Sequence, residues 1–167
     1  MIEVRELQER DISSITRTFE LMGWNKPASQ YQRYLKEQKN GQRVVLIAFE
    51  NVEFVGYLTI IWASGYPPFK TENIPEISDF NVLPKFRRKG FGSLLMDQAE
   101  NIVSQRTPVV GIGVGLDAAY GAAQRLYVLR GYIPDGRGIS YHQRFPKYGE
   151  QVRVDDDLNL YLTKKLR

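Results

Sequence analysis

A short run of basic residues and glycines, Arg87-Arg88-Lys89-Gly90-Phe91-Gly92, combines the features of a phosphate-binding loop. The two glycines let the backbone approach a ligand closely and adopt angles that other residues avoid. Apolar residues at helical spacing follow over 91–103 and predict an amphipathic helix. The first N–H groups of a helix lack internal partners and carry partial positive charge. We therefore expect a phosphate or pyrophosphate site here, with a solvated basic loop as the alternative.

The spacing of the glycines argues against two common nucleotide sites. The P-loop pattern G-x-x-x-x-G-K-[ST] is absent, and the dinucleotide pattern G-x-G-x-x-G meets Leu95 where its third glycine belongs. A second run, Gly111-Ile-Gly113-Val-Gly115, lies within an apolar strand rather than in the turn after one. Its missing side chains make room either for a ligand or neighbouring backbone, or for ordinary tight packing.

The elements that must position the loop can be predicted from hydrophobic periodicity. Strands are expected at 2–6, 43–49, 53–62, 77–82, 109–116, 139–144 and 158–164. Helices are expected from Asp11 to Met22 and over 28–39, 91–103 and 119–130, with a loop at 63–75. This order describes an α/β sandwich, and the length of 167 residues fits one domain spanning 1–167.

Composition excludes several classes of function. The chain has no cysteine and a single histidine, His142, so we expect no disulfide, no cysteine nucleophile and no metal site. It has no signal-peptide pattern and no apolar run of about 20 residues, so we expect a cytoplasmic protein without a membrane partner. The net charge is only +4 and the basic residues are scattered along the chain, so no nucleic-acid partner is expected.

A second motif identifies the class of phosphate ligand. The segment from Ala123 to Tyr132 reads A-x-x-L-Y-x-x-x-G-Y, and the loop from Arg87 to Gly92 fits [QR]-x-x-G-x-[GA]. In this order and spacing, the two motifs resemble the GNAT family of N-acetyltransferases, most sharply over residues 76–132. The resemblance implies an α/β (α+β) fold. Its mixed, mostly antiparallel central sheet would have six to seven strands flanked by helices and would be splayed between the fourth and fifth strands.

The resemblance implies acetyl-CoA as the cofactor. Backbone N–H groups from Arg88 through Ser93 would bind its pyrophosphate, and the backbone at Phe80 would pair with pantetheine and polarise the thioester carbonyl. Tyr120 stands where the family often has an asparagine that contacts pantetheine. The implied cofactor-binding residues are Phe80, Asn81, Val82, Arg87, Arg88, Lys89, Gly90, Phe91, Gly92, Ser93, Tyr120, Ala123 and Tyr127.

The resemblance also implies two catalytic residues. Tyr127 matches the general acid that protonates the departing thiolate, although a core tyrosine is the alternative. Glu76 matches a glutamate base, with a surface glutamate at a strand edge as the alternative. Asp79 is the second candidate for the base, and strand alternation would put its side chain on the opposite face. His142 has a suitable ordinary pKa but is more typical of a structural or exposed residue.

The resemblance implies transfer of an acetyl group to a primary amine by direct attack in a ternary complex, and we expect the amine of a small molecule. The acceptor residues expected from the fold are Trp24, Trp62, Tyr66 and Asp79, joined by Phe69 and Tyr141 in the wall of the site. The aromatic rings could bind an amine by cation–π contacts or could be core residues. A catalytically silent acyl-CoA sensor and a nucleic-acid binder using residues 85–89 are the other hypotheses. The resemblance makes a homodimer through the C-terminal strands an expectation.

Overall fold

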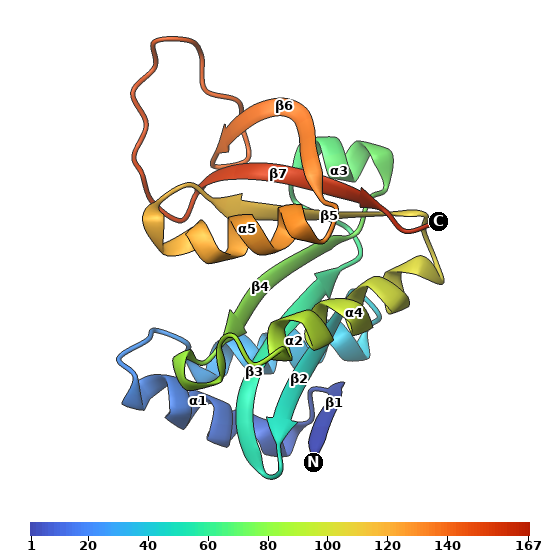
Figure 1. Ribbon diagram of the computed structural model, residues 1–167, viewed down its shortest axis with the longest axis vertical. Helices are drawn as coiled ribbons and strands as arrows, with labels where there is room; N and C mark the ends of the chain where they lie inside the picture. The colour runs from blue at the N-terminus through green and yellow to red at the C-terminus, as the bar shows by residue number, and fades with distance from the viewer. The chain divides into compact units, whose positions relative to one another are not determined.

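A computed structural model describes all residues from Met1 to Arg167, and Figure 1 labels its main elements. Most helices and strands lie within two residues of their predicted bounds. The elements are β1 (Ile2–Glu6), η1 (Glu9–Asp11), α1 (Ile12–Leu21), α2 (Ala28–Lys39), β2 (Arg43–Glu50), β3 (Glu53–Ile61), α3 (Pro67–Glu72), β4 (Glu76–Val82), η2 (Pro84–Phe86), α4 (Phe91–Ser104), β5 (Val109–Gly115), η3 (Ala118–Tyr120), α5 (Gly121–Leu129), β6 (Ile133–Tyr141) and β7 (Leu158–Lys165).

The seven strands form one mixed sheet in the order β1-β2-β3-β4-β5-β7-β6. The pairs β1–β2, β2–β3, β5–β7 and β6–β7 are antiparallel, and β4–β5 is parallel. The parallel register joins Glu76 to Gly111 and Ile77 to Ile112. Such a short parallel pairing matches the predicted splay between the fourth and fifth strands, so the predicted fold class is confirmed.

The chain divides into two compact units, and the divisions fall at the end of β3 and inside β4 and α4. The first unit comprises residues 1–61 and 78–101, and the second comprises residues 62–77 and 102–167. The single domain expected from the sequence stays a prediction.

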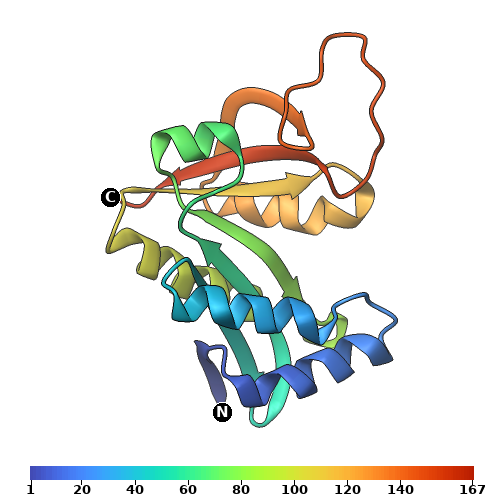
Figure 2. The same cartoon turned by 180° about the vertical axis from the view of Figure 1, so that it is seen from behind.

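In the first unit, α1 and α2 cover one face of β2 and β3, and α4 covers the opposite face (Figures 1 and 2). The helical spacing predicted for α4 is realised, because Phe91, Leu95 and Ala99 are all buried. On the other face, the Phe19 ring stacks on Tyr31 and meets Tyr57 edge-on. These rings form the aromatic part of a core that fixes α1 and α2 against β3.

In the second unit, α3 and α5 lie on opposite faces of the layer formed by β5, β7 and β6 (Figures 1 and 2). The glycine run of β5 lets aromatic rings approach the backbone of this strand. A Cβ atom at Gly111 would lie 2.1 Å from the Phe69 ring, and one at Gly115 would lie 2.4 Å from the Tyr120 ring. At Gly113 the distance to the Tyr161 ring would be 2.9 Å. Tight packing therefore accounts for these glycines.

Two predicted elements are wrong in their bounds or type. The expected loop at 63–75 contains α3, which begins with Pro67 and Pro68 because proline is tolerated in the first helical turn. The strand expected at 139–144 instead runs from Ile133 to Tyr141. It ends there because His142 and Gln143 both have positive φ angles, 49° and 62°, which extended strands do not adopt.

Candidate functional site

The predicted phosphate loop occupies a sharp turn between β4 and α4 in the first unit. Arg88 has a φ of 59° and Gly90 a φ of 88°, so two of its residues are left-handed. The first helical hydrogen bond runs from the Leu94 N–H to the Gly90 carbonyl at 3.0 Å. Like any helix start, α4 therefore leaves its first N–H groups without partners inside the helix. Arg87, Arg88 and Lys89 are exposed and lie just before this positive helix end in the sequence, so they add formal positive charge to the loop.

The two glycines of the loop fit a ligand in different ways. A Cβ atom at Gly90 would meet no atom within 4 Å, so the space beside its backbone is open. One at Gly92 would lie 3.3 Å from the Phe80 ring, a tight contact for which the ring would have to shift by a few tenths of an ångström. An anion could thus approach the backbone of the loop closely, as binding the pyrophosphate of acetyl-CoA would require.

The part of β4 that leads into this loop has an irregular backbone. Asp79 is left-handed, with a φ of 49°, in the middle of the strand. Phe80, Asn81 and Val82 follow it, all half-buried. The Val82 carbonyl accepts a hydrogen bond from Arg87 Nε at 3.0 Å, which ties the loop to the end of the strand. The first unit thus brings Phe80–Val82 and Arg87–Ser93 together.

The Asp79 carboxylate lies at the centre of a polar cluster that the sequence did not predict. Five side chains from three other places in the first unit and from β4 itself donate hydrogen bonds to its two oxygens. The donors are Lys26 Nζ (2.6 Å) and Asn81 Nδ2 (3.0 Å) to Oδ1, and Gln30 Nε2 (2.9 Å), Tyr34 OH (2.9 Å) and Tyr57 OH (2.5 Å) to Oδ2.

These contacts fix the protonation states in the cluster. Burial by itself would raise the pKa of Asp79, but the charge and hydrogen bonds of Lys26 and the tyrosine hydroxyls outweigh it, so its pKa lies below 3.8. Burial, followed by the charge of Asp79, raises the pKa of Tyr34 to about 12 and raises that of Tyr57 as well. At neutral pH the cluster therefore contains a carboxylate with neutral tyrosine donors, and Asp79 is a weak base.

In the second unit, Tyr127 is buried in α5, and Ala123 lies one turn before it. Burial, with a smaller effect from Tyr120, raises the pKa of the Tyr127 phenol, so it is protonated at neutral pH. Tyr120 lies just before α5, and its hydroxyl donates to Asp156 Oδ1 at 2.6 Å. Gly131 follows the C-cap Arg130 with a φ of 90°, the left-handed conformation that commonly ends a helix.

Glu76 begins β4 in the second unit and is half-buried. Its Oε2 accepts a hydrogen bond from Ser64 Oγ at 2.5 Å. The Ser64 oxygen in turn accepts from the Tyr66 N–H at 3.0 Å, and Ser64 is buried. The sequence did not predict this serine, because nothing in its local pattern connects it to Glu76. The contact holds the carboxylate in one orientation.

The predicted acceptor residues have different surroundings. In the first unit, half-buried Trp24 stacks on Phe19, with 5.6 Å between ring centres. In the second unit, Trp62 packs under the guanidinium group of Arg106 at 4.0 Å. Tyr66 is fully buried, stacks on Tyr161 at 3.6 Å and donates to Asp135 Oδ2 at 2.8 Å. Core packing, the alternative considered for these rings, therefore describes Tyr66.

The remaining candidates from the sequence also lie in the second unit. Phe69 is a core residue of α3. Tyr141 ends β6, and its hydroxyl donates to Asp155 Oδ2 at 3.2 Å. His142 is exposed in the turn after β6, where its Nδ1 lies 3.3 Å from Asp157 Oδ2. The exposed position of His142 agrees with the structural or surface role weighed for it from the sequence.

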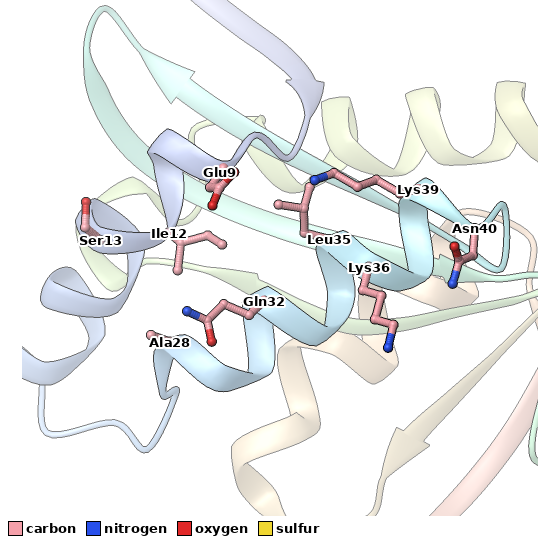
Figure 3. Close-up of a pocket in the computed structure, with 9 residues that line it drawn as sticks. All are labelled: Glu9, Ile12, Ser13, Ala28, Gln32, Leu35, Lys36, Lys39 and Asn40. Carbon is pink, nitrogen blue, oxygen red and sulfur yellow. The ribbon is translucent and has the colours of Figure 1, made fainter.

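An open cavity of about 610 Å³ lies between α1 and α2 in the first unit (Figure 3). Its walls include Ile12 and Leu35, and Glu9, Lys36 and Lys39 add charged groups to its lining. None of the residues predicted to bind cofactor or acceptor lines it. This cavity is therefore not part of the predicted site.

Comparisons with known proteins agree with the motifs. A family model described as the acetyltransferase (GNAT) family matches residues 8–132. The chain is 27% identical over 153 residues to the uncharacterized N-acetyltransferase YhfO of Bacillus subtilis (strain 168), covering 87% of this chain and 99% of that protein.

Two solved structures share the fold over nearly the whole chain. An N-acetyltransferase from Staphylococcus aureus Mu50 has a TM-score of 0.71 and 15% identity, covering 100% of this chain and 99% of that one. The structure of yncA from Salmonella typhimurium with its cofactor acetyl-CoA has a TM-score of 0.70 and 18% identity, covering 99% and 94%. At such identities the likeness establishes the fold alone.

Proposed function

Because this chain belongs to the acetyltransferase (GNAT) family, we propose that it transfers an acetyl group from acetyl-CoA to a primary amine. The observation that carries this proposal is the loop before α4. The loop has two left-handed residues, an open backbone at Gly90 and three exposed cationic residues just before the helix start. Acetyl-CoA is the donor that the family uses, and its pyrophosphate has the charge that this loop would bind.

The proposed cofactor-binding residues are those implied by the motifs. In the first unit, the backbone N–H groups from Arg88 through Ser93 would hold the pyrophosphate, and Phe80, Asn81 and Val82 would pair with pantetheine. In the second unit, Tyr120, Ala123 and Tyr127 of the second motif would contact the cofactor. When bound, acetyl-CoA supplies an activated acetyl thioester.

The proposed reaction is direct attack of the amine on the thioester in a ternary complex. Glu76, or water held by it, would take a proton from the acceptor, because an alkyl amine with a pKa of about 10.4 is mostly protonated at neutral pH. The nitrogen–carbon bond forms as the carbon–sulfur bond breaks. Tyr127, buried and protonated, would then donate a proton to the departing thiolate, whose conjugate thiol has a pKa of about 8.5.

We propose a small-molecule amine as the acceptor, with Trp24 and Trp62 as the aromatic residues that would contact it. None of the helices has the length and apolar character that a membrane-spanning helix needs. We place the protein in the cytoplasm.

A homodimer through the C-terminal strands is also proposed, since β6 is an edge strand with exposed Ile133 and Ile139. A monomer mass by light scattering would contradict it.

Calorimetric titration with acetyl-CoA, CoA and NAD tests the cofactor directly. We expect micromolar binding of acetyl-CoA and CoA and no binding of NAD, because the loop lacks the third glycine of a dinucleotide site. A panel of amines then tests transfer by following release of free thiol. Absence of acetyl-CoA binding would contradict the acetyltransferase proposal. Binding without turnover on any amine would favour the sensor.

The Glu76→Gln variant tests the proposed base. We expect kcat to fall about 100-fold at pH 7, because proton transfer to a positioned carboxylate contributes about this factor or more. Activity should recover as pH rises, because more of the amine is then the free base. Steady-state rates between pH 6 and 10 measure both effects. Glu150→Gln, at a second carboxylate of the same unit, is the control and should keep the wild-type profile. A wild-type profile for Glu76→Gln would exclude Glu76 as the base.

A further inference from the structure

Asp79 combines backbone strain with an unusually complete set of partners. A left-handed residue other than glycine costs free energy and persists only where its surroundings impose it. Aspartate tolerates this conformation better than most residues. Here five donors from α2, β3, β4 and the segment before α2 hold its carboxylate. The strained backbone and the complete set of side-chain contacts thus occur at the same residue.

The same contacts argue against two other roles for Asp79. An ionised carboxylate offers about four lone-pair sites, and five donors already engage them. Its charge is balanced by Lys26, whose Nζ lies 2.6 Å from Oδ1. A carboxylate in this condition has little capacity left to accept a substrate proton or to bind a cationic amine.

Two neighbouring features accommodate the irregular backbone. The Ser78 carbonyl accepts a hydrogen bond from the Thr59 hydroxyl at 3.0 Å, and Arg43 Nη1 donates to that hydroxyl at 2.8 Å. On β3, a Cβ atom at Gly56 would lie 2.3 Å from the Asn81 carbonyl oxygen. The backbone after Asp79 thus lies where a side chain on β3 would otherwise be. The hydrogen bond fixes β4 before Asp79, and the glycine leaves room for its backbone after Asp79.

A left-handed residue inside a strand rotates the adjoining peptide groups and changes the direction of the next residues. The peptide after Asp79 carries the Phe80 N–H, the group that the proposed function assigns to the thioester carbonyl. We propose that Asp79 is a positioning residue. Clamped by Lys26, Gln30, Tyr34, Tyr57 and Asn81, its carboxylate holds β4 in the conformation that directs the Phe80 N–H toward the acetyl carbonyl. This inference rests on the proposed acetyl transfer.

Asp79→Asn and Asp79→Ala separate positioning from charge. Asparagine tolerates the left-handed conformation and keeps part of the hydrogen bonding, whereas alanine does neither. We expect kcat to fall about 10-fold for Asn and about 100-fold for Ala, the effect of losing an aligned oxyanion donor. The acceptor KM should stay within about 2-fold of wild type, because acceptor binding does not depend on this N–H. Equal loss in the two variants would overturn the proposal, since a role through charge is removed by both.

Asp11→Asn is the matched control in the same unit. Asp11 is also a buried carboxylate, paired with Arg5 at 2.7 and 2.8 Å, but it lies outside β4. The Asp11→Asn variant should lose stability and keep wild-type kcat per folded molecule.

If Asp79→Ala does not fold, two other variants still decide the question: Asp79→Asn, and Tyr34→Phe, which removes one donor. A raised acceptor KM with unchanged kcat in these variants would overturn positioning and assign Asp79 to the acceptor. If the wild-type protein does not transfer acetyl groups, it is the proposed function that has failed.

Discussion

Replacing Gly90 with valine should weaken CoA binding about 100-fold while leaving the fold intact. Gly90 has a φ of 88°, which a β-branched residue adopts only with strain. The loop would relieve this strain by changing conformation, and its N–H groups would then no longer converge on one anion. A 100-fold loss corresponds to about 2.7 kcal/mol, the size of the strain that the loop must relieve. Calorimetric titration with CoA measures the loss, and circular dichroism checks the fold.

Gly41→Val is the matched control for the loop. Gly41 also has a positive φ, 71°, and a Cβ there meets no atom within 4 Å, but it lies in the turn after α2. This variant should lose comparable stability and bind CoA as wild type does. Gly92→Val should also lose binding, because its side chain would collide with the Phe80 ring. Wild-type CoA affinity in both loop variants would defeat the pyrophosphate assignment.

Tyr127→Phe should lower kcat about 100-fold or more and leave the Kd for acetyl-CoA nearly unchanged. The substitution removes one hydroxyl and keeps the ring that packs in α5, so the fold should survive. Loss of a positioned general acid costs about 10²–10⁴ in rate. Single-turnover measurements isolate this step, because they report the chemistry without product release. A poorer leaving thiolate needs the acid more, so the defect should shrink with an acyl donor whose thiol has a lower pKa.

Tyr132→Phe is the control for removal of a buried tyrosine hydroxyl. Its ring centre lies 6.0 Å from that of Tyr127, and its side chain is also buried. We expect wild-type kcat from this variant. If Tyr127→Phe were as active as Tyr132→Phe, Tyr127 would be the core tyrosine considered from the sequence. The proton would then reach the thiolate from water.

Elements with strong periodicity could be predicted from the sequence almost to the residue. Helix α2 occupies the expected 28–39, and α4 extends the expected 91–103 by one residue. By contrast, α3 was missed because its six residues begin with two prolines and show no apolar repeat. Tertiary packing forms it, since Tyr66 and Phe69 are buried against Tyr161. The strand expected at 139–144 begins too far along the sequence, because most residues of β6 are exposed and do not alternate between apolar and polar.

The candidate site was only partly predictable, for a reason that Asp79 illustrates. The phosphate loop is a local pattern of glycines and cations, so a single stretch of sequence contains its whole signal. The donors around Asp79 come from four segments, and tyrosines such as Tyr34 and Tyr57 are typical of an aromatic core. Gln30 and Tyr34 lie one turn apart on α2, the spacing of neighbours on a helix surface. Nothing in the sequence connects that pair with β4.

The glycines of β5 have a consequence for how this chain acquires its structure. Rings from α3, η3 and β7 cover the three glycines. The rings of Phe69 and Tyr161 come from residues far from their glycines in the sequence, whereas Tyr120 is close to Gly115. A strand rich in glycine has little preference of its own for the extended state. The entropy cost of closing long loops must therefore be overcome before most of these rings can pack on β5. A strand inside the sheet is thus among the last parts of its unit to become stable, although its neighbours depend on it for backbone hydrogen bonds.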